Sequence, residues 1–278
     1  MKFGVHAGLW QARWTDDIVP ILRKVADLGF DGVEVSLLGM NDEKAAALGQ
    51  AVRDHGLEVT CSDGLAQDKD ITSDDPDVRA AGLAYLEWAI KTTAQIGSQG
   101  LAGVVFAPWG VFDPLNKPLR AERSAEALGA LDKTLADHGV TLGIEALNRF
   151  ETDLVNTAGE ACNIARASGS DRVGVLLDTF HLNMEEKNIG AAIASAADKL
   201  VHFHVSDNDR GVPGSGHIPW SDVKTGLSDA GYDGWIVAEM FVMAGNPASA
   251  DLNIWRNIEA DPTDAATQAL DFMRKTFE

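Results

Sequence analysis

The 278-residue sequence predicts a single closed (β/α)8 barrel that spans residues 1–278. Three observations lead to this prediction. Eight short apolar runs alternate with amphipathic stretches along the whole chain. These runs are almost continuously apolar, as expected of parallel strands that are buried on both faces. Several of the amphipathic stretches stop at a glycine, which supplies the left-handed backbone conformation that often ends a helix.

The expected strands lie near residues 2–7, 31–36, 57–62, 101–106, 140–145, 173–178, 200–205 and 235–240. The helical stretches between them stop at Gly29, Gly56, Gly97, Gly139, Gly169 and Gly231. The clearest helix covers residues 42–55, because Asn41 can cap its first turn and two acidic residues follow. A doubly wound open sheet is the alternative fold, but no glycine-rich phosphate-binding phrase follows the first strand.

Composition and charge narrow the class of protein. The chain is 45% hydrophobic and can bury a large core, and barrels of this kind use about 250 residues as one domain. A formal net charge of -19 would repel a phosphate backbone, so we expect no nucleic-acid partner. No segment reads as a signal peptide or a membrane span. The two cysteines, Cys61 and Cys162, lie outside any CxxC spacing, which fits a reducing compartment, and we expect the cytoplasm.

Four residues able to bind a divalent metal stand at the downstream ends of the last four runs: Glu145, Asp178, His204 and Glu239. The gaps between them are 33, 26 and 35 residues, which is one strand and one helix per gap, since such a unit takes roughly 30 residues. Parallel strands would therefore bring all four side chains to one edge of the barrel. Glu145 and Glu239 come from the outer two of these strands, so we expect them on opposite sides of a bound substrate.

The chemistry of these four residues favours a metal ion. Acidic side chains at the ends of apolar strands are costly to bury unless a positive charge meets them. Three carboxylates and one imidazole form a hard, oxygen-rich shell, which suits Mn²⁺, with Mg²⁺ or Co²⁺ as alternatives, better than structural zinc. Any one of the acids could instead cap a helix or pair with a surface base. All four at strand ends together favour a metal site.

Several phrases at these positions point to a known family. They are IEALNRFE at residues 144–151, LDTFHLN at 177–183, VHFH at 201–204 and PGSGHIPW at 213–220. Shorter phrases add weaker support, such as LGFDGVEV at residues 28–35 and APW at 107–109. With these phrases the chain resembles, nearly end to end, the ketose 3-epimerases of the xylose isomerase-like barrels. The resemblance implies a metal-dependent isomerase that inverts C3 of a free ketohexose or ketopentose through an enediolate.

The resemblance also implies roles for individual residues. The same four residues that the spacing selects match the metal ligands of the family: Glu145, Asp178, His204 and Glu239. Glu145 and Glu239 would act as the catalytic base and acid, and either could remove the proton according to the starting epimer. His181 and Arg210 match residues that hold substrate oxygens, and Glu151 matches a carboxylate at the hydroxyl end of the substrate.

Further candidates rest on position. We expect Trp109 and His6 to contact the substrate, although His6 stands where the family commonly has an aromatic residue. His202 shares a strand face with His204 but lies deeper, so we expect a core histidine. We place His181 on a loop that follows Asp178. Four aromatic residues could wall off a sugar, although core packing explains them equally well: Trp10, Trp14, Trp109 and Phe241.

The chain departs from the family pattern near the expected site. Residues 206–210 read SDNDR where the family has Gly-Glu, a variable residue and Asn-Arg, and Met240 replaces a proline. The spacing to Arg210 is kept. The sequence therefore predicts the reaction class but not the preferred ketose.

Three functional classes stay open. They are the ketose 3-epimerase, an aldose-ketose or hydroxypyruvate-type isomerase on the same barrel, and a non-catalytic sugar-binding barrel. Zinc endonucleases that act on abasic DNA share this barrel class, but the acidic composition disfavours them. The expected partners are a small sugar, no membrane, and further copies of the chain in a homodimer or homotetramer, as the family resemblance suggests.

Overall fold

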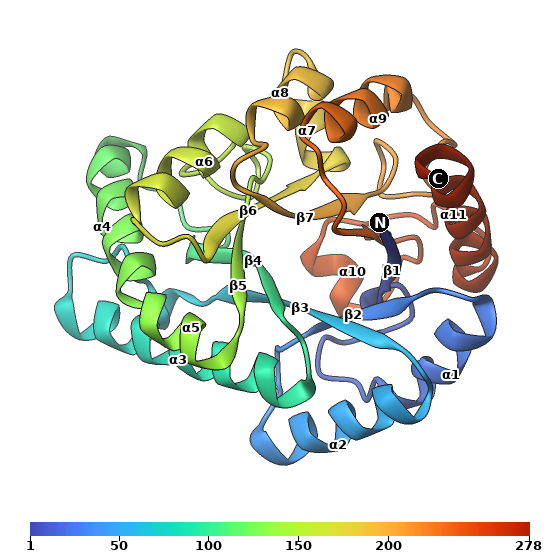
Figure 1. Cartoon of the computed structure of the whole chain (residues 1–278), viewed down its shortest axis with the longest axis horizontal. Helices are drawn as coiled ribbons and strands as arrows, with labels where there is room; N and C mark the ends of the chain where they lie inside the picture. The colour runs from blue at the N-terminus through green and yellow to red at the C-terminus, as the bar shows by residue number, and fades with distance from the viewer.

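The computed structural model describes residues Met1–Glu278 and contains a closed barrel of eight parallel strands. Neighbouring strands pair in chain order, and the last strand, β8, closes the barrel on the first, β1. The helices lie on the outside of this ring (Figure 1). The predicted (β/α)8 fold is therefore confirmed. None of the helices is both long enough and apolar enough to cross a membrane.

The strands are β1 Lys2–His6, β2 Gly32–Ser36, β3 Glu58–Leu65, β4 Gly100–Pro108, β5 Thr141–Glu145, β6 Val173–Asp178, β7 Leu200–Val205 and β8 Trp235–Ala238. The α-helices are α1 Val19–Leu28, α2 Asp42–Asp54, α3 Pro76–Ile96, α4 Lys117–Ala130, α5 Asp132–His138, α6 Ala158–Ala167, α7 Thr179–Glu185, α8 Ile189–Ser195, α9 Trp220–Asp229, α10 Pro247–Asp251 and α11 Pro262–Phe277. Three short 3-10 turns complete the chain: η1 Ala7–Leu9, η2 Gln67–Lys69 and η3 Pro114–Asn116.

Local sequence explains most element boundaries. Asn41 caps α2 as expected, because its side chain accepts a hydrogen bond from the amide of Lys44 at 2.9 Å. All six glycines that were expected to end helices have positive φ angles, between 63° at Gly231 and 103° at Gly97. The strand ends are less regular. β3 and β4 run two to three residues further than the pattern predicts, and β8 stops at Ala238.

The pairing of β6 with β7 contains a one-residue irregularity that matters for the site. Val175 pairs with Leu200, but the next residue, Leu176, pairs with His202, so one residue of β7 is passed over. As a result Asp178 lies directly beside His204. Without the irregularity, continued one-to-one pairing would put an apolar residue, Phe203, in that place.

Loops from distant parts of the chain meet at the carboxyl ends of the strands. The amide of Ala248 in α10 donates to the carbonyl oxygen of Ala12, and the indole of Trp14 donates to Asp251 at 2.9 Å. The loop after β1 is therefore tied to the segment after β8. Barrel enzymes build their active sites at this face, from the loops that follow the strands.

Candidate active site and metal centre

The four residues chosen as metal ligands converge at the mouth of the barrel. Glu145 and Asp178 are the last residues of β5 and β6, His204 lies near the end of β7, and Glu239 directly follows β8. One ligand atom from each residue lies within 4.8 Å of the others. Three of the side chains are buried, and Glu239 is only 12% exposed. The strand order therefore brings these residues together as expected.

A divalent cation fits this donor set. His204 is buried, and its Nδ1 has no hydrogen-bond partner although it lies 3.5 Å from Oε1 of Glu239. A buried nitrogen that aims at a carboxylate cluster without a partner is costly unless a cation or a proton occupies the space between them. The three carboxylates supply the oxygen atoms that Mn²⁺ and Mg²⁺ prefer.

Arg210 contributes a second positive charge to the same cluster. Its Nη1 donates to Oδ2 of Asp178 at 2.6 Å and to Oε2 of Glu239 at 2.7 Å. The guanidinium also lies over the ring of Phe180, 4.1 Å from the ring centre. Arg210 is buried, so two ligand carboxylates are neutralised in part by this side chain.

The loop after β7 holds Arg210 in an unusual backbone conformation. The φ angle of Arg210 is 69°, in the left-handed region that L residues rarely adopt. Asp207 organises this loop: it is fully buried and accepts from the amides of Asn208 at 2.9 Å and Gly214 at 2.8 Å and from the indole of Trp220 at 3.2 Å. The carboxylate of Asp207 therefore accepts hydrogen bonds from loop amides that would be paired with backbone carbonyl groups in a helix or a strand.

The two outer carboxyl groups favour opposite protonation states. Burial, and then the charge of Glu239, raise the pKa of Glu145 well above its usual value. Burial also acts on Glu239, but the positive charges of His204 and Arg210 outweigh it and hold the pKa of Glu239 well below its usual value. Such a divergent pair is the pattern by which an acid and a base are assigned in enzyme sites.

His181 is a neutral ring with a hydrogen-bond donor close to each of its nitrogens. The backbone amide of Asn148 donates to Nδ1 of His181 at 3.1 Å, so Nδ1 carries no proton. Burial, and then the charge of Arg210, lower the pKa of His181 to about 3. Nε2 lies 3.1 Å from Nη2 of Arg210, which can only donate, and 3.6 Å from Oε1 of Glu145. The ring therefore lies between the guanidinium of Arg210 and the carboxyl group of Glu145.

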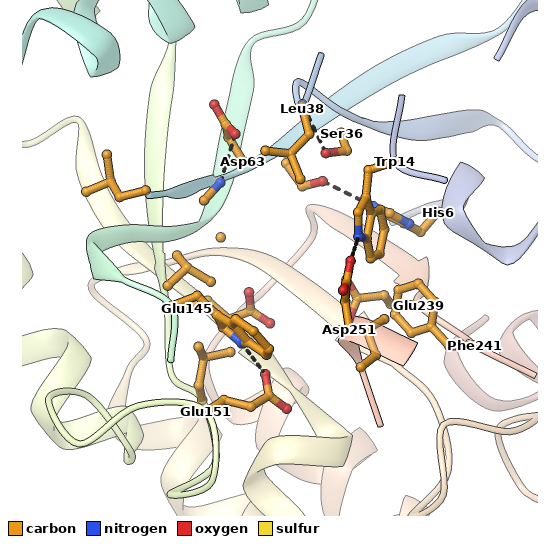
Figure 2. Close-up of a pocket in the computed structure, with 18 of the residues that line it drawn as sticks. His6, Trp14, Ser36, Leu38, Asp63, Glu145, Glu151, Glu239, Phe241 and Asp251 are labelled. Atoms are coloured by element: carbon orange, nitrogen blue, oxygen red, sulfur yellow. Dashed lines mark hydrogen bonds between the residues drawn. The ribbon is translucent and has the colours of Figure 1, made fainter. Parts of the chain in front are cut away.

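Two members of the ligand cluster, Glu145 and Glu239, line a cavity of about 320 Å³, a size typical of small-molecule sites. In Figure 2, Glu145 and Glu151 lie on one side of the open space, and His6, Trp14 and Phe241 lie on the other. All five predicted substrate contacts line this cavity: His6, Trp109, Glu151, His181 and Arg210.

The walls are held by specific hydrogen bonds. Glu151 accepts from the indole of Trp109 at 3.0 Å and from the side-chain amide of Asn148 at 2.7 Å. On the opposite wall, Nδ1 of His6 accepts from the amide of Gly8, so Nε2 carries the proton and donates to Ser62 at 3.1 Å. Burial lowers the pKa of His6, which keeps the ring neutral.

Two details of the sequence analysis are corrected by the structure. His181 lies in the first turn of α7 and not on a loop, because Asp178 caps that helix at once through a hydrogen bond from the amide of Phe180. Asp178 is thus both a helix cap and a member of the ligand cluster. Trp10 does not line the cavity, since its indole donates to Thr263 at the start of α11.

Sequence reasoning missed several residues of the site. Asn148 and Asp207 give no signal by residue type alone, because polar residues are common in loops. Glu34 is fully buried beneath the cluster and was also missed. Its signal was visible as a single acid between two valines of an apolar run. His202, expected to be a core histidine, is buried and hydrogen-bonded to Glu34 at 2.6 Å.

A second hollow of about 800 Å³ opens at the other end of the barrel. Its lining includes the exposed ion pair of Lys2 and Glu58 and the side chain of Trp235. These residues lie at the amino ends of their strands, away from the ligand cluster. Since catalytic groups of barrel enzymes gather at the carboxyl face, the smaller cavity is the candidate active site.

Asp63 in the cavity wall should make stability depend on pH. It is 6% exposed and accepts from the hydroxyl of Tyr85 at 2.9 Å, and burial raises its pKa to about 6. The folded state then keeps a proton that the unfolded chain releases near pH 4, so this contribution to stability falls as the pH rises through about 4 to 6.

Asp63→Asn should remove this dependence, because asparagine has a similar shape and no charge. Between about pH 4.5 and about pH 7, the wild type should lose roughly 2 kcal/mol of unfolding free energy more than the variant. Urea denaturation in the presence of a chelator measures the difference. Parallel stability curves for the two proteins would contradict the assignment.

Comparison with known proteins agrees with the fold and with the family resemblance. A sequence model described as the xylose isomerase-like TIM barrel matches residues 22–276. A D-psicose 3-epimerase of Agrobacterium fabrum is 34% identical over 99% of this chain and 98% of its own. An L-ribulose 3-epimerase of Mesorhizobium japonicum is 34% identical over 98% of this chain and 93% of its own.

A solved structure gives the same result in three dimensions. The crystal structure of a D-psicose 3-epimerase in the presence of D-fructose matches with a TM-score of 0.95 and 33% identity, covering 100% of this chain and 99% of that chain. The closed barrel and its carboxylate-rich mouth thus define a xylose isomerase-like TIM barrel. Within that class, the chain belongs to the ketose 3-epimerase family.

Proposed function

We propose that this chain is a metal-dependent ketose 3-epimerase, a single catalytic domain over residues 1–278 that inverts C3 of a free ketohexose or ketopentose. The observation that carries the proposal is the pair Glu145 and Glu239. The two carboxyl groups belong to one ligand cluster and come from the ends of β5 and β8, the first and last of the four strands that supply it. The similarity of the whole chain to D-psicose and L-ribulose 3-epimerases supports the same reaction.

Epimerisation at C3 requires that a proton leave one face of the carbon and return to the other. The positive charges of His204 and Arg210 favour the ionised form of Glu239, which suits Glu239 as the base for one epimer. Glu145, whose pKa is raised, holds the proton that is returned. When the two groups exchange protonation states, the opposite epimer can react, so both directions use the same residues.

The remaining side chains stabilise charge and orient the sugar. The guanidinium of Arg210 lies in the cavity lining and can donate to the oxygen on which negative charge develops, and His181 lies 3.1 Å from its Nη2 and orients it. When bound at Glu145, Asp178, His204 and Glu239, a divalent cation supplies Lewis-acid stabilisation of that charge. Glu151 and Trp109 present a carboxylate and an aromatic edge to the sugar hydroxyl groups.

The cavity favours an uncharged sugar over a sugar phosphate or a sugar acid. Arg210 is the only lysine or arginine among the residues that line it. Its Nη1 is already paired with Asp178 and Glu239. Three further acids, Asp63, Glu151 and Asp251, would repel an anionic substrate.

We also propose Mn²⁺ as the cation, the cytoplasm as the compartment and a homodimer or homotetramer as the assembly. The oxygen-rich donor set supports Mn²⁺, with Mg²⁺ or Co²⁺ as alternatives. Both cysteines are unpaired and buried, which suits a reducing compartment. Exposed apolar side chains, such as Leu115 at 92% and Phe150 at 75%, are typical of a surface that another copy covers.

Deuterium labelling tests the reaction. The protein with Mn²⁺ should convert a ketose to its C3 epimer in heavy water, and NMR should find deuterium at C3 of the recovered sugars. A panel of ketotetroses, ketopentoses and ketohexoses identifies the substrate in the same experiment. The matched control is the same sample after chelation, which should show neither conversion nor label.

Other labelling patterns would contradict the proposal in distinct ways. Label at C1 together with an aldose product would indicate an aldose-ketose isomerase. Sugar binding without label, unchanged in Glu145→Gln and Glu239→Gln, would indicate a non-catalytic binding protein.

A further inference from the structure

Glu34 lies beneath the metal centre and is not among the residues that line the cavity. It is the third residue of β2, its side chain is fully buried, and no lysine or arginine contacts it. Three polar groups surround it instead. The hydroxyl of Thr60 donates to Oε2 at 2.8 Å, Nε2 of His202 lies 2.6 Å from Oε2, and Nε2 of His204 lies 2.7 Å from Oε1.

The contact with His204 links Glu34 to the ligand cluster. In the imidazole ring of His204, Nε2 faces Glu34 and Nδ1 faces Glu239. The short contact to Glu34 is bent, so it is an ion-pair contact more than a linear hydrogen bond. A carboxylate has no proton to donate, so Nε2 must carry the proton at this distance. The lone pair of a neutral His204 is then on Nδ1.

The distances also decide against a second cation between Glu34 and the two histidines, although the three side chains could in principle hold one. Ligands that sit about 2.1 Å from a tetrahedral ion are about 3.3 Å or more apart. The separations of 2.6 and 2.7 Å found here are hydrogen-bond distances. Glu34 therefore forms a hydrogen bond with His202 and a close ion-pair contact with His204.

We propose that Glu34 is a positioning residue for the metal centre, which holds Nε2–H of His204 so that Nδ1 faces the cation. This inference rests on the proposed function only in requiring that the four-residue cluster binds a metal. Residues behind a metal-binding histidine fix its ring orientation and decide which nitrogen carries the proton. Glu34 reaches His204 from across the barrel, since β2 and β7 are not neighbouring strands.

Glu34→Gln is a sharp test because the amide has one acceptor and one donor. Thr60 and His202 both donate to Oε2 in the wild type, so the amide oxygen should take that place. The amide NH₂ then faces Nε2 of His204 and favours the ring form with its proton on Nδ1. That proton points at the cation site, where metal binding must displace it.

Calorimetric titration with Mn²⁺ measures the effect directly. Glu34→Gln should weaken Mn²⁺ binding by about 10- to 100-fold. The absorption spectrum of the Co²⁺-loaded variant should differ from that of the wild type, because the orientation of one ligand changes. Epimerase activity should return largely at saturating Mn²⁺, since Glu34 touches no substrate.

Thr60→Val is the matched control, because it removes one donor to Glu34 but leaves the carboxylate facing His204. It should bind Mn²⁺ within about threefold of the wild type, well below the 10- to 100-fold range expected of a lost histidine partner. Near-UV circular dichroism checks that each variant is folded. Should Glu34→Gln fail to fold, Glu34→Asp keeps the charge and withdraws it from His204, and it should show the same loss of Mn²⁺ affinity.

The outcomes separate this inference from the proposed function. Wild-type binding of Mn²⁺ with equal binding by folded Glu34→Gln and Glu34→Asp would overturn the role of Glu34 and leave the epimerase proposal standing. Two Mn²⁺ ions per wild-type chain, one of them lost in Glu34→Gln, would also overturn it. A wild-type protein that epimerises ketoses without binding Mn²⁺, Mg²⁺ or Co²⁺ would overturn both.

Discussion

Glu239→Gln is expected to lower kcat for C3 epimerisation by 10³-fold or more, in line with the roughly 10²–10⁴-fold contribution of a positioned acid or base and the loss of one metal ligand. Glutamine keeps the size of the side chain but cannot accept the proton from C3. The rate of conversion at saturating Mn²⁺ and ketose, followed by chromatography in both directions, measures the loss.

The matched control is Glu185→Gln in α7. Glu185 is an acid near the mouth that pairs with the exposed Arg149 and does not line the cavity. Its replacement should leave kcat within about twofold, because Glu185 belongs neither to the ligand cluster nor to the cavity lining. A Glu239→Gln variant that keeps a tenth of the wild-type kcat would rule out the assigned base. Glu145→Gln should show a comparable loss, with solvent exchange impaired most from the opposite epimer.

Arg210→Met is expected to destabilise the metal-free protein by about 3–5 kcal/mol, because it leaves buried carboxylates without their cation. Asp178 is fully buried and Glu239 is nearly so, and no other lysine or arginine forms an ion pair with either carboxylate. Methionine approximates the length of the side chain, so the change is chiefly one of charge. Urea unfolding with chelator present measures the difference.

Mn²⁺ should restore more stability to Arg210→Met than to the wild type, because the ion neutralises the same carboxylates. Arg166→Met serves as the control: Arg166 and its partner Asp198 are 45% and 58% exposed, so its loss should change stability little. Equal stability of Arg210→Met and the wild type without metal would contradict the view that Arg210 neutralises the cluster.

Much of the barrel could be predicted because its signals are local. Apolar runs of strand length and glycine-terminated helices repeat along the chain, and one strand-helix unit separates each pair of proposed ligands. The position of Glu145, Asp178, His204 and Glu239 at one face follows from parallel pairing alone. The family resemblance added Glu151, His181 and Arg210, which residue type and spacing would not have selected.

The rest depends on contacts between residues far apart in sequence. The register irregularity that sets Asp178 beside His204 is a property of paired strands, and neither strand shows it alone. The ring form of His181 depends on the amide of Asn148, 33 residues away. The proposed role of Glu34 depends on its contacts with His202 and His204, on the other side of the barrel. Sequence patterns of a single chain carry none of this information.

The chain divides its site unevenly between its two halves. Every proposed ligand, together with His181 and Arg210, comes from residues 145–239, whereas much of the facing wall comes from His6, Trp14, Ser62 and Asp63 in the first quarter. A chimaera that took its leading half-barrel from a relative with another sugar preference would keep its proton-transfer groups intact. Recombination at the midpoint should therefore change the preference among ketoses more than it changes the chemical step.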